Sequence, residues 1–199
     1  AISYLFNSDV PWPVPGRASS PMHPSRLLAD IGGTNIRLAW QATPQGPFND
    51  IRVQPCDDYP SLTAAVSAYL AQVPVPQPCE AAFGIANPVV GDAVRMTNHS
   101  WSFSQRAVQE ALGLQRLIVI NDFTALALAL PQLKPELLRQ VGGSQAVPGA
   151  AVALLGPGTG LGVSGLLFPQ GSGRGVPLAG EGGHVSLAAE TAQEFEVVS

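Results

Sequence analysis

The stretch LLADIGGTNIRLAW (residues 27–40) decides the fold. An apolar run stops at Asp30 and a Gly-Gly-Thr-Asn turn and then continues, which predicts two strands, 26–31 and 36–42, joined by a tight hairpin turn. Two adjacent glycines let a ligand approach the backbone and leave amide donors exposed as a nest for anions. An ordinary hairpin turn with a capping threonine is the alternative interpretation, and the turn taken alone favours that alternative.

The composition is that of a globular protein with a mild negative charge. The chain has 199 residues, of which 46% are hydrophobic and 12% charged, and its formal net charge is −4. Its ten Lys and Arg residues are scattered, whereas binding to nucleic acid requires clustered basic side chains. No apolar run is long enough to span a bilayer, and residues 1–25 lack the layout of a secretory signal. We therefore expect neither nucleic acid nor a membrane as a partner.

The two cysteines, Cys56 and Cys79, form neither a metal-binding motif nor a disulfide framework. This pattern fits a reducing compartment, so we expect a cytoplasmic protein.

Strands and helices alternate from Arg26 onward, which predicts an α/β fold. After the hairpin we expect a third strand near 51–54, a helix within 59–73, and a buried strand at 79–86 with a partner strand at 92–97. A helix from Ser104 to about Leu112, a strand at 116–122 and a helix at 123–133 should follow. The last part should contain strands at 150–156 and 161–168, a glycine-rich loop at 177–188 and a helix from about Ala192.

Proline content divides the chain further. Five prolines forbid regular structure in residues 1–25, which we interpret as a leader or arm. The pattern changes again near Pro131–Pro135. We expect a first α/β domain at 26–132 and the start of a second domain at 133–199.

A second glycine-rich turn, GPGTGLG (156–162), repeats the chemistry of the first. Two such turns between apolar strands suggest a phosphate chain held from two sides, and two ordinary hairpins are the alternative. The sequence has no P-loop lysine motif and no dinucleotide-binding fingerprint. Backbone amides, a divalent cation and Arg37 would have to neutralise the phosphates. Asp30 is placed to hold that cation, directly or through water.

Two other segments carry polar side chains in apolar surroundings. Asp122 ends an apolar strand and starts a helix, in the crevice where open α/β sheets bind ligands. A helix N-cap is the alternative role, which would explain Asp122 but not the neighbouring Asn121. Glu181 and His184 lie among glycines, and their alternatives are an exposed loop acid and a structural histidine. Together the four side chains suit a ligand with vicinal hydroxyls better than a structural zinc ion.

Five motifs in this order resemble the bacterial glucokinases of the hexokinase-like type. They are LLADIGGTNIRLAW, MTNHSW, VINDFTALALALPQL, GPGTGLGV and LAGEGGHVSLA, and the resemblance covers residues 26–199. It implies the actin-like ATPase fold, with two α/β domains around a cleft. It also implies ATP-dependent phosphorylation of the 6-hydroxyl of glucose, by an enzyme that forms a homodimer.

The resemblance also assigns roles by position in these motifs. It makes Asp122 the general base and Asn121, Glu181 and His184 sugar ligands, with Thr97 and Asn98 in a loop near the sugar. It places the ATP phosphates against Ala29, Asp30, Ile31, Gly32, Gly33 and Thr34 and against Gly158, Thr159 and Gly160. Mg²⁺ would arrive with the nucleotide, beside Asp30.

Members of this family continue well beyond residue 199, so we expect an incomplete chain. By resemblance, the part beyond it would carry another sugar-binding glutamate and most of the adenosine pocket. A non-catalytic sugar-binding or regulatory fragment is the alternative function. Sugar-kinase relatives that double as repressors share the first turn, but they use a cysteine-rich zinc motif that Cys56 and Cys79 do not provide.

Overall fold

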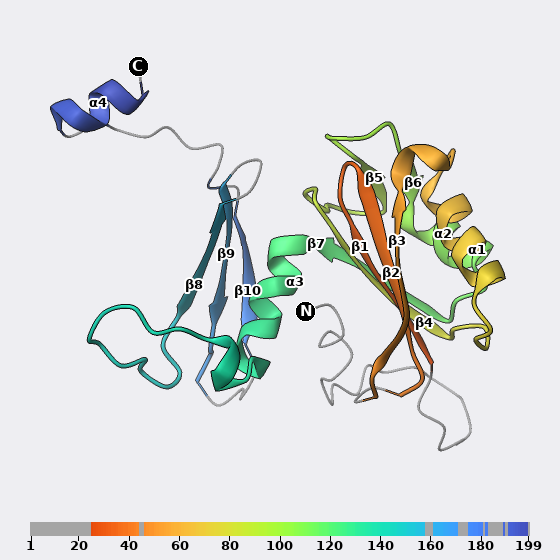
Figure 1. Cartoon of the computed structure of the whole chain (residues 1–199), viewed down its shortest axis with the longest axis horizontal. Coiled ribbons are helices and arrows are strands. Elements are labelled where there is room, and N and C mark those ends of the chain that lie inside the picture. The colour runs from red at the N-terminus through yellow and green to blue at the C-terminus, as the bar shows by residue number, and fades with distance from the viewer. Residues whose placement is uncertain are drawn as a thin grey trace. The chain divides into compact units, whose positions relative to one another are not determined.

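The predicted hairpin lies at the centre of a five-stranded mixed sheet in the computed structural model (Figure 1). The structure describes residues 25–43, 46–157, 161–170, 175–180, 182, 189 and 191–198. The chain divides into two compact units, residues 1–144 and 145–199. Of the predicted arm at 1–25, only Ser25 is described. The proposed boundary between domains at 132/133 stays a prediction.

The five strands of the first unit have the order β3-β2-β1-β4-β7. Their bounds are β1 Arg26–Ile31, β2 Asn35–Gln41, β3 Phe48–Pro55, β4 Glu80–Ile85 and β7 Arg116–Asn121. The first three form an antiparallel meander, and β4 and β7 run parallel to β1. Ile31 pairs with Ile85, which pairs with Asn121, so the three parallel strands end level at one edge of the sheet.

Helices α1 (Leu62–Gln72) and α2 (Gln105–Ala111) cover one face of this sheet (Figure 1). Side chains alternate between the two faces of a strand, so Leu27, Ala29 and Ile31 of β1 enter the core under these helices. Leu28 belongs to a separate small cluster with Ala82. Asp30 follows the same alternation as Leu28, which keeps its carboxylate out of the main core.

A serine side chain caps each of these two helices. The Ser61 Oγ accepts a hydrogen bond from the Ala64 amide, and the Ser104 Oγ accepts one from the Ala107 amide. Each side chain satisfies an amide that has no partner within its helix. Gly113 follows α2 with a φ of 63°, the left-handed conformation that ends a helix.

Three details differ from the expectations. Residues 93–95 form β5 (Ala93–Arg95), which pairs with β6 (Ser102–Ser104) rather than with β4, because β1 and β7 already occupy both edges of β4. Helix α3 (Asp122–Ala129) ends before 133 and continues as the 3₁₀ turns η3 (Leu130–Gln132) and η4 (Pro135–Leu137), since prolines cannot donate the helical hydrogen bond.

The third difference lies in the second unit, where β8 (Val152–Pro157), β9 (Leu161–Leu167) and β10 (Val176–Gly180) form an antiparallel sheet before α4 (Ala192–Val198). The predicted loop at 177–188 therefore begins as strand β10. Gly180 pairs with Val163, and a Cβ on it would lie 3.0 Å from the Val163 carbonyl oxygen. This glycine serves close pairing between strands instead of a turn.

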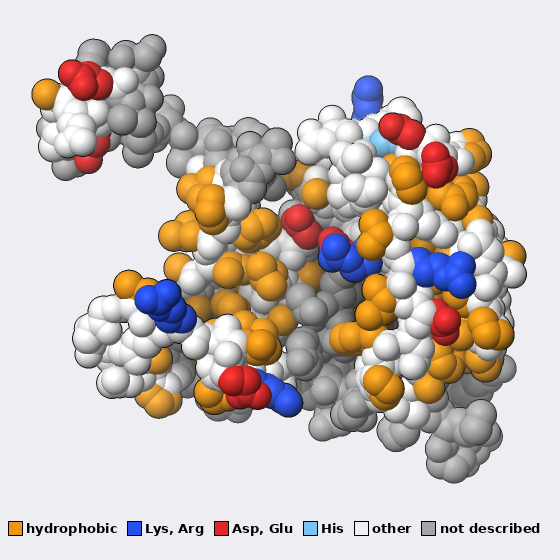
Figure 2. All heavy atoms as spheres, viewed as in Figure 1, with side chains coloured by type: hydrophobic (Ala, Val, Ile, Leu, Met, Phe, Trp, Pro, Cys, Tyr) orange, Lys and Arg blue, Asp and Glu red, His pale blue; other side chains and the backbone are white. Residues whose placement is uncertain are grey.

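The helices in the described part of the chain are all too short or too polar to cross a membrane. Figure 2 shows basic side chains scattered over the visible face, next to acidic ones in several places. The view fits the scatter of Lys and Arg along the sequence.

Candidate functional site

The candidate site lies at the edge where the parallel strands of the first unit end. Asp30 stands one residue before the end of β1, Asn87 follows β4, and Asn121 ends β7. Asp122 is the first residue of α3. Ligands of open α/β sheets bind at the carboxyl ends of the strands, so the sheet brings these side chains to the edge where binding is expected.

The GGTN turn (residues 32–35) closes through a hydrogen bond from the Gly32 amide to the Asn35 carbonyl oxygen at 2.9 Å. Together with Asp30, Arg37 and Val53, it lines a hollow of about 260 Å³. The two glycines differ in their surroundings. A Cβ on Gly33 would lie 2.7 Å from the Asn98 carbonyl oxygen, whereas one on Gly32 would meet only the Asn35 carbonyl oxygen at 3.4 Å. Gly33 is therefore required by packing within the protein.

Asp30 and Arg37 face each other across the hairpin. They are paired in register on β1 and β2, and Arg37 Nη1 lies 3.3 Å from Asp30 Oδ2. Both side chains are more than half exposed, so the pair contributes little stability and can rearrange around a ligand. In the described part of the chain, no three His, Cys, Asp or Glu side chains gather as a metal site. A divalent cation at Asp30 would depend on the ligand's own oxygens and on water, as Mg²⁺ commonly does.

The carboxylate of Asp122 is held at the start of α3. Its Oδ1 accepts hydrogen bonds from the Phe123 amide at 2.8 Å and from Asn121 Nδ2 at 3.0 Å. Burial raises the pKa of Asp122 above its ordinary value, and the negative charge of Asp30 raises it further, although the hydrogen bonds act in the opposite direction. A carboxylate with a raised pKa is a better proton acceptor than an exposed one.

Asn121, rather than Asp122, is the N-cap of α3. Its Oδ1 accepts a hydrogen bond from the Thr124 amide at 3.1 Å, while its Nδ2 donates to Asp122. The alternative that made Asp122 the cap is therefore wrong. Because Asn121 caps the helix, the Asp122 carboxylate is not needed for capping. The hydrogen bond from Asn121 Nδ2 also fixes the orientation of that carboxylate.

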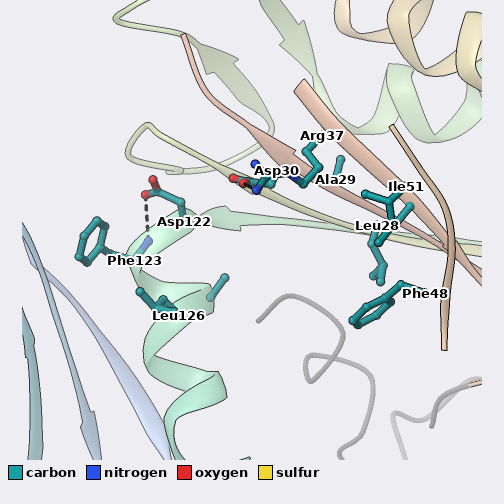
Figure 3. A pocket seen from close by; sticks show the side chains of 11 residues that line it. Leu28, Ala29, Asp30, Arg37, Phe48, Ile51, Asp122, Phe123 and Leu126 are labelled. Carbon is teal, nitrogen blue, oxygen red and sulfur yellow. Dashed lines mark hydrogen bonds and ion pairs between the residues drawn. The ribbon is translucent and has the colours of Figure 1, made fainter. Parts of the chain in front are cut away.

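A pocket of about 440 Å³ separates the sheet from α3 (Figure 3). Asp30, Arg37 and Asp122 are its charged lining residues, and Figure 3 shows Asp30 and Asp122 at the same end. The rest of the lining is apolar: Leu28, Ala29, Ala39, Phe48, Ile51, Phe123, Ala125 and Leu126. The charged end is suited to hydroxyl and phosphate groups, and the apolar part is not.

Asn87 is a residue of this site that the sequence reasoning missed. It is 7% exposed, and its Oδ1 accepts a hydrogen bond from the Thr97 amide at 2.9 Å. Its carbonyl oxygen lies 3.5 Å from Asn121 Nδ2. The signal in the sequence was an Asn-Pro pair directly after the buried strand predicted at 79–86, near the end at which Asp30 and Asn121 lie on their own strands. Asn87 thus connects the loop of Thr97 to the start of α3.

The structure brings together most of the predicted residues of the first unit. The exposed Thr97 and Asn98 follow β5, beside the GGTN turn, and Ala29 and Ile31 are buried in the core. Five predicted residues lie outside the described part of the chain: Gly158, Thr159, Gly160, Glu181 and His184. All of the assigned ligand contacts, including those of Ala29 and Ile31, stay predictions.

Comparisons with known proteins identify the family and the fold of this chain. The family model described as Glucokinase matches residues 27–199. The glucokinase of Aromatoleum aromaticum is 54% identical over 175 residues, which are 87% of this chain and 52% of the relative. The crystal structure of a glucokinase from an Antarctic psychrotroph matches with a TM-score of 0.75 at 34% identity. The match covers 88% of this chain and 55% of the glucokinase chain.

A glucokinase from Balamuthia mandrillaris, solved in complex with glucose, matches with a TM-score of 0.59 at 21% identity. The match covers 91% of this chain and 55% of that glucokinase, and at this identity it shows the fold alone. The chain spans about half the length of the curated relative it matches. These likenesses confirm the predicted actin-like ATPase fold, and the family drawn from the five motifs is confirmed by the match over residues 27–199. The chain belongs to the glucokinase family.

Proposed function

We propose that this chain carries part of the active site of an enzyme that transfers the γ-phosphoryl group of ATP to the 6-hydroxyl of glucose. The observation that supports it is the juxtaposition of three features at one edge of the sheet. Asp122 lies half-buried at the start of α3, Asp30 lines the same pocket, and the GGTN turn adjoins Asp30. A proton acceptor beside a phosphate-binding turn is what a sugar kinase needs.

In this proposal Asp122 accepts the proton of the 6-hydroxyl. The hydrogen bonds from the Phe123 amide and Asn121 Nδ2 both reach Oδ1. Oδ2 is then the atom that takes the proton. General-base help of this kind is worth about 10²–10⁴-fold in rate. Alignment of the two substrates supplies more, on the order of 7–11 kcal/mol in good cases.

The residues proposed to bind a ligand come from both units of the chain. In the first unit the amides of Gly32, Gly33 and Thr34 and the carboxylate of Asp30 serve the ATP phosphates and their Mg²⁺. When bound, Mg²⁺ neutralises charge on the phosphate oxygens. Thr97, Asn98 and Asn121 serve the sugar. On the strength of their motifs alone, Gly158, Thr159 and Gly160 are proposed to bind the ATP phosphates, and Glu181 and His184 to bind the sugar.

Glucose is the proposed sugar because the family match and the 54% identical relative are named glucokinases. The Balamuthia mandrillaris protein, of the same fold, was solved with glucose. We also propose a cytoplasmic location and a homodimer. The free thiols of Cys56 and Cys79 fit a reducing compartment. The homodimer rests on the resemblance alone.

A direct assay distinguishes this function from simple sugar binding. The whole protein is incubated with MgATP and either glucose or 6-deoxyglucose, and phosphorylated sugar is measured together with ADP. The proposal expects glucose 6-phosphate and ADP in equal amounts, and no product from 6-deoxyglucose, which lacks the acceptor hydroxyl. Binding of glucose without any product would contradict the proposal and favour a non-catalytic sugar-binding protein.

A further inference from the structure

A short turn between β3 and α1 contacts two loops of the candidate site at once. It comprises the 3₁₀ helix η2 (Cys56–Asp58) and Tyr59, and we call it the CDDY turn. Neither the family motifs nor the proposed chemistry assigns it a role. Its contacts reach the GGTN turn on one side and the loop of residues 97–101 on the other.

The contact with the GGTN turn is made by Cys56. The Cys56 amide donates a hydrogen bond to the Thr34 carbonyl oxygen at 2.8 Å, and its thiol lies 3.6 Å from the Gly32 carbonyl oxygen. Cys56 is completely buried. The two carbonyl groups that flank Gly33 are therefore both fixed by one residue of the CDDY turn.

The contact with the 97–101 loop is made by Asp57 and Tyr59. Asp57 Oδ1 lies 3.2 Å from His99 Nε2, and the Tyr59 carbonyl oxygen accepts a hydrogen bond from Trp101 Nε1 at 3.1 Å. The His99 side chain is only 7% exposed, whereas that of Asp57 is 91% exposed. An otherwise solvated carboxylate thus reaches a buried ring.

His99 joins this contact to the backbone of its own loop. Its Nδ1 accepts a hydrogen bond from the Trp101 amide at 3.2 Å, so the proton of the neutral ring is on Nε2, which donates to Asp57. The ring also packs edge-on against Trp101, with 4.7 Å between ring centroids. His99 therefore has one orientation in which both of its nitrogens are used.

The two loops also touch each other directly, where Gly33 meets Asn98. That contact sets how closely the two loops can approach, but a steric contact does not stop them from separating. The hydrogen bonds of the CDDY turn hold the two loops together. In the same loop as Asn98, the Thr97 amide donates a hydrogen bond to Asn87 Oδ1, and the Asn87 carbonyl oxygen lies 3.5 Å from Asn121 Nδ2.

We propose that the CDDY turn and His99 form a brace that sets the distance between the GGTN turn, proposed to bind phosphate, and the 97–101 loop, proposed to lie near the sugar. His99 is then a positioning residue for phosphoryl transfer, and this role rests on the proposed function. Transfer between two bound substrates depends steeply on their alignment, and a misplacement of about 1 Å can cost 10²-fold in rate. The brace would act on that alignment without touching either substrate.

Asp57 is the part of the brace that can be removed without unfolding the protein. Cys56 and Trp101 are buried in the core, so their loss would destabilise the fold itself. The Asp57 carboxylate is exposed, and its single contact with the neutral His99 ring contributes little stability. In the whole protein, Asp57→Ala should lower kcat about tenfold while the melting temperature stays within about 2 °C of the unchanged protein.

Two matched variants separate positioning from a structural effect. Asp57→Asn keeps an oxygen that accepts the Nε2 proton and should restore kcat. His99→Asn keeps an acceptor for the Trp101 amide but does not reach Asp57, so it should resemble Asp57→Ala. Gln72→Ala is the control, because it removes an exposed hydrogen bond of 2.8 Å from Arg52 between β3 and α1, outside both loops, and should leave kcat unchanged.

Hydrogen–deuterium exchange on the 199-residue chain tests the brace without any activity. In Asp57→Ala the amides of Cys56 and Thr97 keep their own acceptors, Thr34 and Asn87, yet should exchange about tenfold faster because the loops they bind are released. Unchanged exchange at both amides would overturn the brace, as would a fall in kcat that Asp57→Asn does not restore. A whole protein that phosphorylates no glucose would instead overturn the proposed function, and the exchange result would still decide the brace.

Discussion

Asn121 caps the helix that begins with Asp122 and also donates a hydrogen bond to the Asp122 carboxylate, at 3.0 Å. One amide side chain therefore performs two tasks. Its oxygen satisfies the Thr124 amide at the helix end, and its nitrogen steadies the proposed base. The two tasks can be separated by substitution, because a carboxylate at this position can perform the first and not the second.

Asn121→Asp should preserve the helix but disturb the base. Aspartate is as good an N-cap as asparagine, so the melting temperature should change little. A second carboxylate beside Asp122 disfavours the ionised form of its neighbour and should raise the pKa of Asp122 further. Since the base works ionised, the acid limb of kcat/KM should move to higher pH. A pH–rate profile with an unmoved acid limb would show that Asn121 does not act on the base.

Asp122 should cost the folded protein stability at neutral pH. Burial raises its pKa in the folded state above the ordinary value of 3.8. At pH values between the ordinary pKa and the raised pKa, the folded state binds more protons than the unfolded state. The free energy of unfolding therefore decreases as the pH rises through this range. Asp122→Asn should therefore raise the melting temperature at pH 7, and by less at pH 4. Thermal unfolding of both forms at the two pH values checks this, and a lower melting temperature for Asp122→Asn at pH 7 would refute it.

The two glycines of the GGTN turn should respond differently to the same substitution. Gly33→Ala places a methyl group 2.7 Å from a backbone oxygen of Asn98, which cannot move aside without its loop, so we expect a loss of about 1–3 kcal/mol in unfolding free energy. Gly32→Ala makes only an ordinary contact at 3.4 Å and should stay within about 0.5 kcal/mol. Urea unfolding measures both. Equal losses would mean that the Gly33–Asn98 contact does not hold in solution.

Local patterns in the sequence predicted the elements well where a single segment carries the signal. The hairpin around the GGTN turn, the helices that became α1 and α2 and the strand that leads to Asp122 are all confirmed. Each depends on neighbouring residues or on helical spacing. The α/β class followed from their order.

Contacts between distant segments could not be predicted in the same way. The pairing of β5 depends on which edges of β4 are already occupied, and the close approach of Asn98 to Gly33 joins positions far apart in the chain. The same holds for Asn87, whose partners Thr97 and Asn121 come from two other segments. The sequence indicated polar residues after strands, but only the assembled sheet shows which of them meet.

The rate of phosphoryl transfer in Asp122→Asn tests the central claim most directly. Kinetics of the whole protein with glucose and MgATP should show kcat reduced by about 10²–10⁴-fold, because the substituted amide cannot accept the hydroxyl proton. Glucose affinity, measured by titration calorimetry on the same preparation, should change by less than about tenfold, since an amide still fits the space and still accepts the bonds from Phe123 and Asn121. A near-normal kcat in this variant would contradict the account and leave Asp122 as no more than the first residue of α3.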